Sequence, residues 1–162
     1  MLWYRRFRVA AYVNAVVWLA WTVAILLPLA PFSDLQPIMV GGGPGTWFLL
    51  AYLLFPIVGV GGLAGISSLL FVIEGYEQRR LNDGVMTTGF ILLYGGILVG
   101  CLLLGAAGAS GGYALVIQRF TANAVQNVLS PYVDPITAAS LVAVAGTGFT
   151  ICGMATAKAT KP

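Results

Sequence analysis

The chain has 162 residues, of which 59% are hydrophobic and only 8% are charged. A water-soluble domain usually carries about 25% charged residues, so a chain this poor in charge cannot cover a water-facing surface. Each helix that crosses a bilayer needs about 20 mostly apolar residues, so four such helices leave room only for short loops and tails. The composition therefore excludes an ordinary soluble protein and predicts one all-α integral membrane domain, a bundle of four transmembrane helices.

The sequence also lacks the usual ligands of metals and haem. It has no histidine, and its two cysteines, Cys101 and Cys152, fall inside apolar runs without the spacing of a zinc site. Haem, copper and non-haem iron are normally held by histidine. We therefore expect no cofactor and no metal. The basic residues form no stripe with interleaved aromatic residues, so we expect no nucleic-acid partner and no soluble substrate.

The first predicted span covers about residues 9–28. The residues before it, from Trp3 to Arg8, are mostly aromatic or basic, as expected of an anchor at the headgroup level. The apolar stretch is longer than the core of a signal peptide, so we expect a retained helix. Asn14 is the strongest polar group inside any predicted span. We interpret its amide as a hydrogen-bonding group that joins two helices rather than as a contact for a substrate.

The second predicted span covers about residues 46–73 and follows a proline- and glycine-rich segment, residues 31–45, that we interpret as a loop. Pro56 lies inside the span, so we expect a kink there or a released backbone carbonyl. The loop that follows, residues 74–84, contains three of the five acidic residues and is the most polar stretch of the chain.

The third predicted span covers about residues 85–108, and Gly111 and Gly112 indicate a break after it. Residues 113–129 carry apolar side chains at helical spacing, with polar residues between them. This pattern predicts a separate amphipathic helix on the extracytoplasmic side, in contact with either lipid or protein. The fourth predicted span covers about residues 135–157, with Asp134 as its N-cap.

The basic residues predict the orientation of the chain. With the N-terminus inside, seven of the eight lie on the cytoplasmic side and only Arg119 lies outside. Cytoplasmic loops of membrane proteins carry an excess of Lys and Arg. We therefore predict a multi-pass protein of the cell membrane with both termini in the cytoplasm.

Pairs of small residues four positions apart occur on three of the four predicted spans. Such pairs allow two backbones to approach closely, which is how helices associate within a membrane. We predict that these residues, together with Asn14, pack helices and contact a partner. The pairs are Gly61 and Gly65, Gly96 and Gly100, Ala139 and Ala143, and Gly148 with Cys152.

The four predicted spans contain no Asp, Glu, Lys, Arg or His. Proton pumps, ion-coupled carriers and acid-lined cation pores usually need a charge at membrane depth. No nucleophile–base pair is evident either, so we predict that the chain is not an enzyme by itself. We expect a non-catalytic accessory or structural subunit of a multi-subunit membrane complex, by analogy with respiratory oxidases and membrane monooxygenases. Its partners would be other integral membrane subunits and lipids. The alternative is a small homo-oligomeric transporter or channel.

Overall fold

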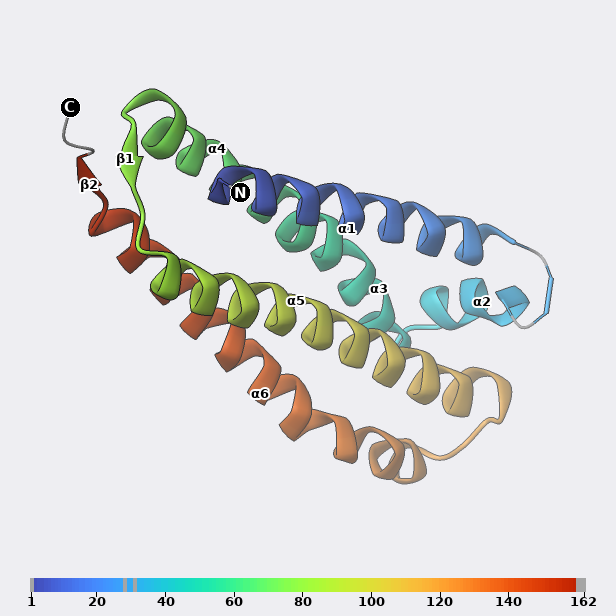
Figure 1. The fold of residues 1–162 in the computed structure, drawn as a ribbon. Coiled ribbons are helices and arrows are strands. Elements are labelled where there is room, and N and C mark those ends of the chain that lie inside the picture. The colour runs from blue at the N-terminus through green and yellow to red at the C-terminus, as the bar shows by residue number, and fades with distance from the viewer. Residues whose placement is uncertain (1, 28, 31, 160–162) are drawn as a thin grey trace.

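The computed structural model describes residues 2–27, 29–30 and 32–159. Four long helices run alongside one another in alternating directions (Figure 1). Each is long and apolar enough to cross a membrane, so the prediction of four such helices is confirmed. They are α1 (Trp3–Leu26), then α3 (Gly45–Leu54), η2 (Phe55–Gly62), α4 (Leu63–Phe71) and η3 (Val72–Tyr76) as one continuous helix, then α5 (Asp83–Gly112) with η4 (Tyr113–Ile117), and α6 (Ala122–Ala155).

Smaller elements lie at the two ends of the bundle. The segment interpreted as a loop before the second long helix contains a short turn, η1 (Phe32–Asp34), and a six-residue helix, α2 (Leu35–Val40). At the other end, β1 (Arg79–Arg80) pairs with β2 (Lys158–Ala159) in an antiparallel ribbon. The β1 strand lies in the polar loop between the second and third long helices, and β2 follows the fourth. The ribbon therefore ties the segment after the fourth helix to this loop, at the end of the bundle where α1 begins (Figure 1).

The prediction of a separate amphipathic helix over residues 113–129 is wrong. Residues 113–117 continue the third long helix, and residues 122–129 form the first turns of α6. The chain turns between them at residues 118–121, where Arg119 adopts a left-handed backbone conformation with φ 56°. The apolar pattern of the segment therefore comes from two antiparallel helix ends. Because an arginine rather than a glycine occupies the turn, residue type alone does not indicate this break.

The predicted start of the fourth span at Asp134 and Pro135 is also displaced. Both Pro131 and Pro135 lie inside α6, which continues through them. Their exposed positions let the helix pass without a clash against a neighbour. Val125 and Leu129, in the turns before them, are buried in a cluster with Ala107 of α5. This packing stabilises the early turns of α6 despite the two lost hydrogen bonds.

The second long helix changes its winding at the predicted kink. From Phe55 to Gly62, directly after α3, it adopts a π-helix. Pro56 has no N–H to donate to the preceding turn, so one hydrogen bond of the α-helical ladder is missing there. A wider turn accommodates the missing bond and presents the carbonyls of this stretch to neighbouring groups.

The long helices pack against one another mainly in neighbouring pairs. The α1 helix packs against η2 and α4, the α3 segment packs against α5, and α6 packs mainly against α5 (Figure 1). The largest core cluster lies at the end that holds the ribbon, where Phe7 of α1 meets Phe90 of α5 with ring centroids 5.0 Å apart. In the most apolar 18-residue stretch of each long helix, no more than 28% of the residues are buried. Most of the apolar surface of the long helices therefore lies on the outside of the bundle.

Phe7 is fully buried in this cluster, so its truncation should leave a cavity between α1 and α5. We expect Phe7→Ala to lower the free energy of unfolding by about 3–5 kcal/mol, because buried aromatic side chains cost this much to remove. Phe149→Ala on the outer face of α6 serves as the control, since Phe149 is 43% exposed. Unfolding in detergent, followed by circular dichroism, measures both variants. Equal losses would contradict the packing described here.

Candidate functional site at the helix-packing surfaces

The contact between α5 and α6 brings four of the predicted residues together. A Cβ atom added to Gly96 would lie 2.5 Å from the backbone nitrogen of Ala143 and 2.8 Å from the carbonyl oxygen of Ala139. A Cβ on Gly100 would lie 3.6 Å from the Ala139 Cβ. Backbone meets backbone at Gly96, so no side chain of any size fits there. We call this contact the α5–α6 seam.

The seam extends beyond the residues that the sequence singled out. Gly146 lies directly against the backbone of Leu93, and a Cβ on Gly89 would lie 2.9 Å from the backbone nitrogen of Thr150. The Thr150 hydroxyl donates to the Gly146 carbonyl at 2.8 Å, so this buried polar group is satisfied within its own helix. Positions 139, 143, 146, 150 and 153 of α6 alternate steps of four and three, and this heptad spacing was the signal that could have revealed the full seam.

Three other predicted residues, Gly61, Gly65 and Gly148, lie on the outer surface of the bundle. Among the residues that the structure describes, a Cβ on Gly65 or Gly148 would meet no heavy atom within 4 Å, and one on Gly61 would meet only the Pro56 carbonyl of its own helix at 3.6 Å. Cys152, one turn beyond Gly148, is exposed as well. These positions do not pack helices within the chain.

The exposed glycines of the second long helix belong to a continuous face of small residues. Gly61, Ala64, Gly65 and Ser68 are all exposed, and their spacing places them on one side of the helix. The Ser68 hydroxyl donates to the Ala64 carbonyl at 3.0 Å, so the face offers no unsatisfied polar group. We call these four residues the outer small-residue face.

Asn14 joins α1 to the π-helical stretch. Its side chain is fully buried, and its Nδ2 donates to the carbonyl oxygen of Gly59 at 2.8 Å. A Cβ on Gly59 would lie 3.0 Å from that Nδ2, so glycine gives the amide its access to the backbone. The Oδ1 of Asn14 has no hydrogen-bond partner among the described residues, nor has the buried Nε1 of Trp18. Half of the amide is thus unpaired, which limits what the bond adds to stability.

The glycines at the far end of α5 are contact points rather than a break. Gly108 lies directly against the backbone of Phe48 in α3, and Gly112 lies directly against the side chain of Ile38 in α2. The predicted interruption at Gly111 and Gly112 is therefore wrong, because the helix runs through both residues. The contacts that favour glycine here are tertiary ones.

The described residues contain no group of three or more His, Cys, Asp or Glu side chains close enough to hold a metal ion. A scan against protein-family models and searches of the curated proteins and of the solved structures found no match for this chain. The chemistry of its own surfaces is therefore the basis for any proposed function.

The α5–α6 seam and the outer small-residue face respond differently to the same substitution. Gly96→Ala forces a Cβ into backbone atoms of α6 and should lower the free energy of unfolding by about 1–3 kcal/mol. Gly65→Ala meets open space and should be neutral or stabilising by up to about 1 kcal/mol, because alanine favours a helix over glycine. Both replacements gain the same intrinsic helix propensity, so unfolding of the purified chain in detergent compares the packing alone. Equal stability of the two variants would contradict the seam.

Replacement of Asn14 by leucine tests the bond to the π-helical stretch. We expect Asn14→Leu to lower the free energy of unfolding by about 0.5–1.5 kcal/mol, within the range of single hydrogen bonds between membrane helices. Ser68→Ala is the matched control, because the Ser68 hydroxyl bonds only within its own helix. If Asn14→Leu is as stable as Ser68→Ala, the hydrogen bond from Asn14 to the Gly59 carbonyl does not contribute to the free energy of unfolding.

Proposed function

We propose that the chain is inserted in a cell membrane by its four long helices and serves there as a non-catalytic subunit of a multi-subunit complex. In this role it packs against other integral membrane subunits, with lipid over the remaining apolar surface. Respiratory oxidases and membrane monooxygenases are complexes of the kind proposed. The proposal has two parts, an orientation and a partner surface, which rest on different residues.

The distribution of basic residues supports an orientation with both ends in the cytoplasm. One end of the bundle holds Arg5, in the first turn of α1, and the ribbon with Arg79 and Arg80. Lys158 lies at the same end, opposite Arg80 in the β-register of the ribbon. Arg119 lies at the opposite end, in the turn before α6. Such an excess of Lys and Arg is typical of the cytoplasmic side.

The observation that carries the subunit proposal is the outer small-residue face. A helix surrounded only by lipid has no need of small residues, and Ile57 and Leu69 beside this face are 65% and 59% exposed. Gly61, Ala64 and Gly65 instead leave room for the backbone of another helix, and close backbone approach drives association in a bilayer. Gly148 of α6 is a second exposed position of this kind.

The alternative is a homo-oligomeric transporter or channel with a pathway near Pro56. The π-helical stretch favours it, since such stretches often occur at functional sites. Against it, the Gly59 carbonyl is already bonded to Asn14, and both groups are buried. A cavity of about 210 Å³ beside this stretch, between the second helix, α5 and α6, is lined mainly by apolar side chains such as Leu54 and Ile136. A lipid chain suits such a lining better than a polar solute does.

Assembly in the native membrane tests the proposal. We expect the gently solubilised protein to migrate with unrelated larger polypeptides on a native gel. Gly65→Leu should abolish this co-migration, because the larger side chain prevents close approach at the outer small-residue face. The purified variant should keep its stability, since no atom of the described residues lies within 4 Å of a Cβ placed at this position.

Ala138→Leu is the control on α6, where the exposed alanine has no glycine, alanine or serine three or four positions away. Glu77→Ala should also leave assembly unchanged, since Glu77 pairs with Arg79 in solvent. Normal assembly of Gly65→Leu would contradict the partner surface. A uniform homo-oligomer that transports a solute after reconstitution would support the alternative instead.

A further inference from the structure

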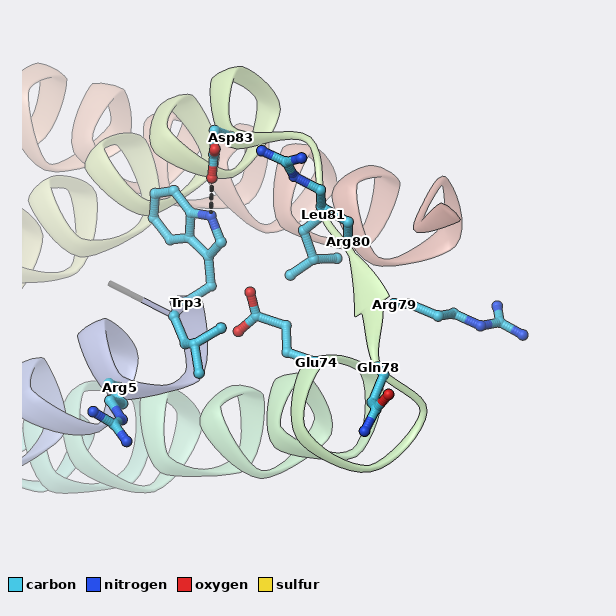
Figure 2. A pocket seen from close by; sticks show the side chains of 9 residues that line it. Trp3, Arg5, Glu74, Gln78, Arg79, Arg80, Leu81 and Asp83 are labelled. Carbon is cyan, nitrogen blue, oxygen red and sulfur yellow. Dashed lines mark hydrogen bonds between the residues drawn. The ribbon is translucent and has the colours of Figure 1, made fainter. Parts of the chain in front are cut away.

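A cavity of about 580 Å³ opens at the end of the bundle that carries the ribbon. It lies between the first turn of α1, the end of the second long helix and the start of α5 (Figure 2). Leu2, Trp3 and Leu81 give it an apolar wall, while three arginines and two carboxylates also line it. It is separate from the outer small-residue face and from the α5–α6 seam.

Hydrogen bonds hold the walls of this cavity in place. The Trp3 indole is 2% exposed, and its Nε1 donates to Asp83 Oδ1 at 2.9 Å. The guanidinium of Arg6 lies 4.2 Å from the centre of the Trp3 ring. Glu74 Oε2 accepts the backbone N–H of Tyr4 at 3.1 Å, one of the amides that a helix start leaves without an internal partner. The site is therefore formed by three long helices that are tied together at their ends.

The two kinds of charge in the cavity are not paired with each other. Arg79 forms a salt bridge with Glu77 at 3.0 Å, and its side chain extends away from Trp3 and Glu74 (Figure 2). That is the only salt bridge among the described residues, so Arg5 and Arg80 have no carboxylate within salt-bridge distance. Arg5 is held by its Nε, which donates to the Tyr4 hydroxyl at 3.2 Å, and this leaves its terminal nitrogens available.

Glu74 determines what kind of ligand suits the cavity. Its carboxylate points into the space between Trp3 and Leu81, with Arg5 and Arg80 on opposite sides of it (Figure 2). A guanidinium favours phosphate, to which it donates two parallel hydrogen bonds. A carboxylate in the same space repels a simple anion but attracts an ammonium group. The ligand that satisfies both is a phosphate ester that also carries a primary ammonium.

The level of the cavity indicates where this ligand comes from. Tryptophan, tyrosine and arginine at a helix end mark the headgroup region of a bilayer. In the orientation proposed above, Trp3, Tyr4 and Arg5 bring the cavity to the phosphates of the cytoplasmic leaflet. We propose that the cavity binds the headgroup of an aminophospholipid, with its ammonium on Glu74 and its phosphate on an arginine of the rim. This inference rests on the proposed membrane insertion, but not on any partner subunit.

Native mass spectrometry of the purified chain with added lipids tests the inference. We expect phosphatidylethanolamine to bind more tightly than phosphatidylcholine, whose methylated ammonium cannot donate to Glu74, and more tightly than phosphatidylglycerol, which has no ammonium. Glu74→Gln should remove this preference while its amide oxygen still accepts the Tyr4 N–H. Arg5→Gln or Arg80→Gln should weaken binding about tenfold, the loss that corresponds to one charge-assisted hydrogen bond.

Asp134→Asn and Arg8→Gln are matched controls, because neither residue lines the cavity, and both should bind like the unmodified chain. Equal binding of the three lipids, or a preference for phosphatidylglycerol, would overturn the inference. So would full competition by free phosphoethanolamine at the concentration of the lipid, which would identify a soluble phosphate ester as the ligand. The lipid preference of the unmodified chain decides the matter even if Glu74→Gln fails to fold. Because only the purified chain is used, loss of lipid selectivity is distinguishable from failure to assemble with other subunits.

Discussion

The approach of α6 to α5 without intervening side chains is the constraint on which the fold depends. At Gly96 and Gly146 each helix meets the backbone of the other, so neither position tolerates even a methyl group. Inside a bilayer apolar side chains gain nothing by leaving lipid for protein, and van der Waals contact has to hold the helices together. Since α6 packs mainly against α5, this one seam attaches the last of the four long helices to the rest.

The first two helices are joined in a different way. Pro56 interrupts the α-helical ladder, and the π-helical turn that follows presents the Gly59 carbonyl to the buried amide of Asn14. Asn14 lies 45 positions before Gly59 in the chain, and its side chain donates to this buried backbone acceptor. The same wider turn carries Gly61 at the start of the outer small-residue face, so the break in regular winding and the candidate partner surface are parts of one element.

Polar interactions are concentrated at one end of the bundle. There Trp3 bonds to Asp83, Tyr4 to Glu74, and the ribbon joins the polar loop to the chain end. These contacts hold the long helices in register at their ends. In the proposed orientation this end lies at the level of the headgroups, where water and lipid can supply the remaining hydrogen bonds.

The sequence by itself determined the four apolar helices, the disturbance at Pro56 and the small pairs Gly96–Gly100 and Ala139–Ala143, because each follows from composition or local spacing. It offered two patterns of small residues in the fourth span, the heptad spacing through Gly146 and the spacing of four that joins Gly148 to Cys152, and only the packing of α6 against α5 selects the first. It also could not tell that residues 113–129 are two helix ends. The turn at Arg119 and the passage of α6 through Pro131 and Pro135 are stabilised by contacts of Val125 and Leu129 with α5, and such contacts exist only once the helices have come together.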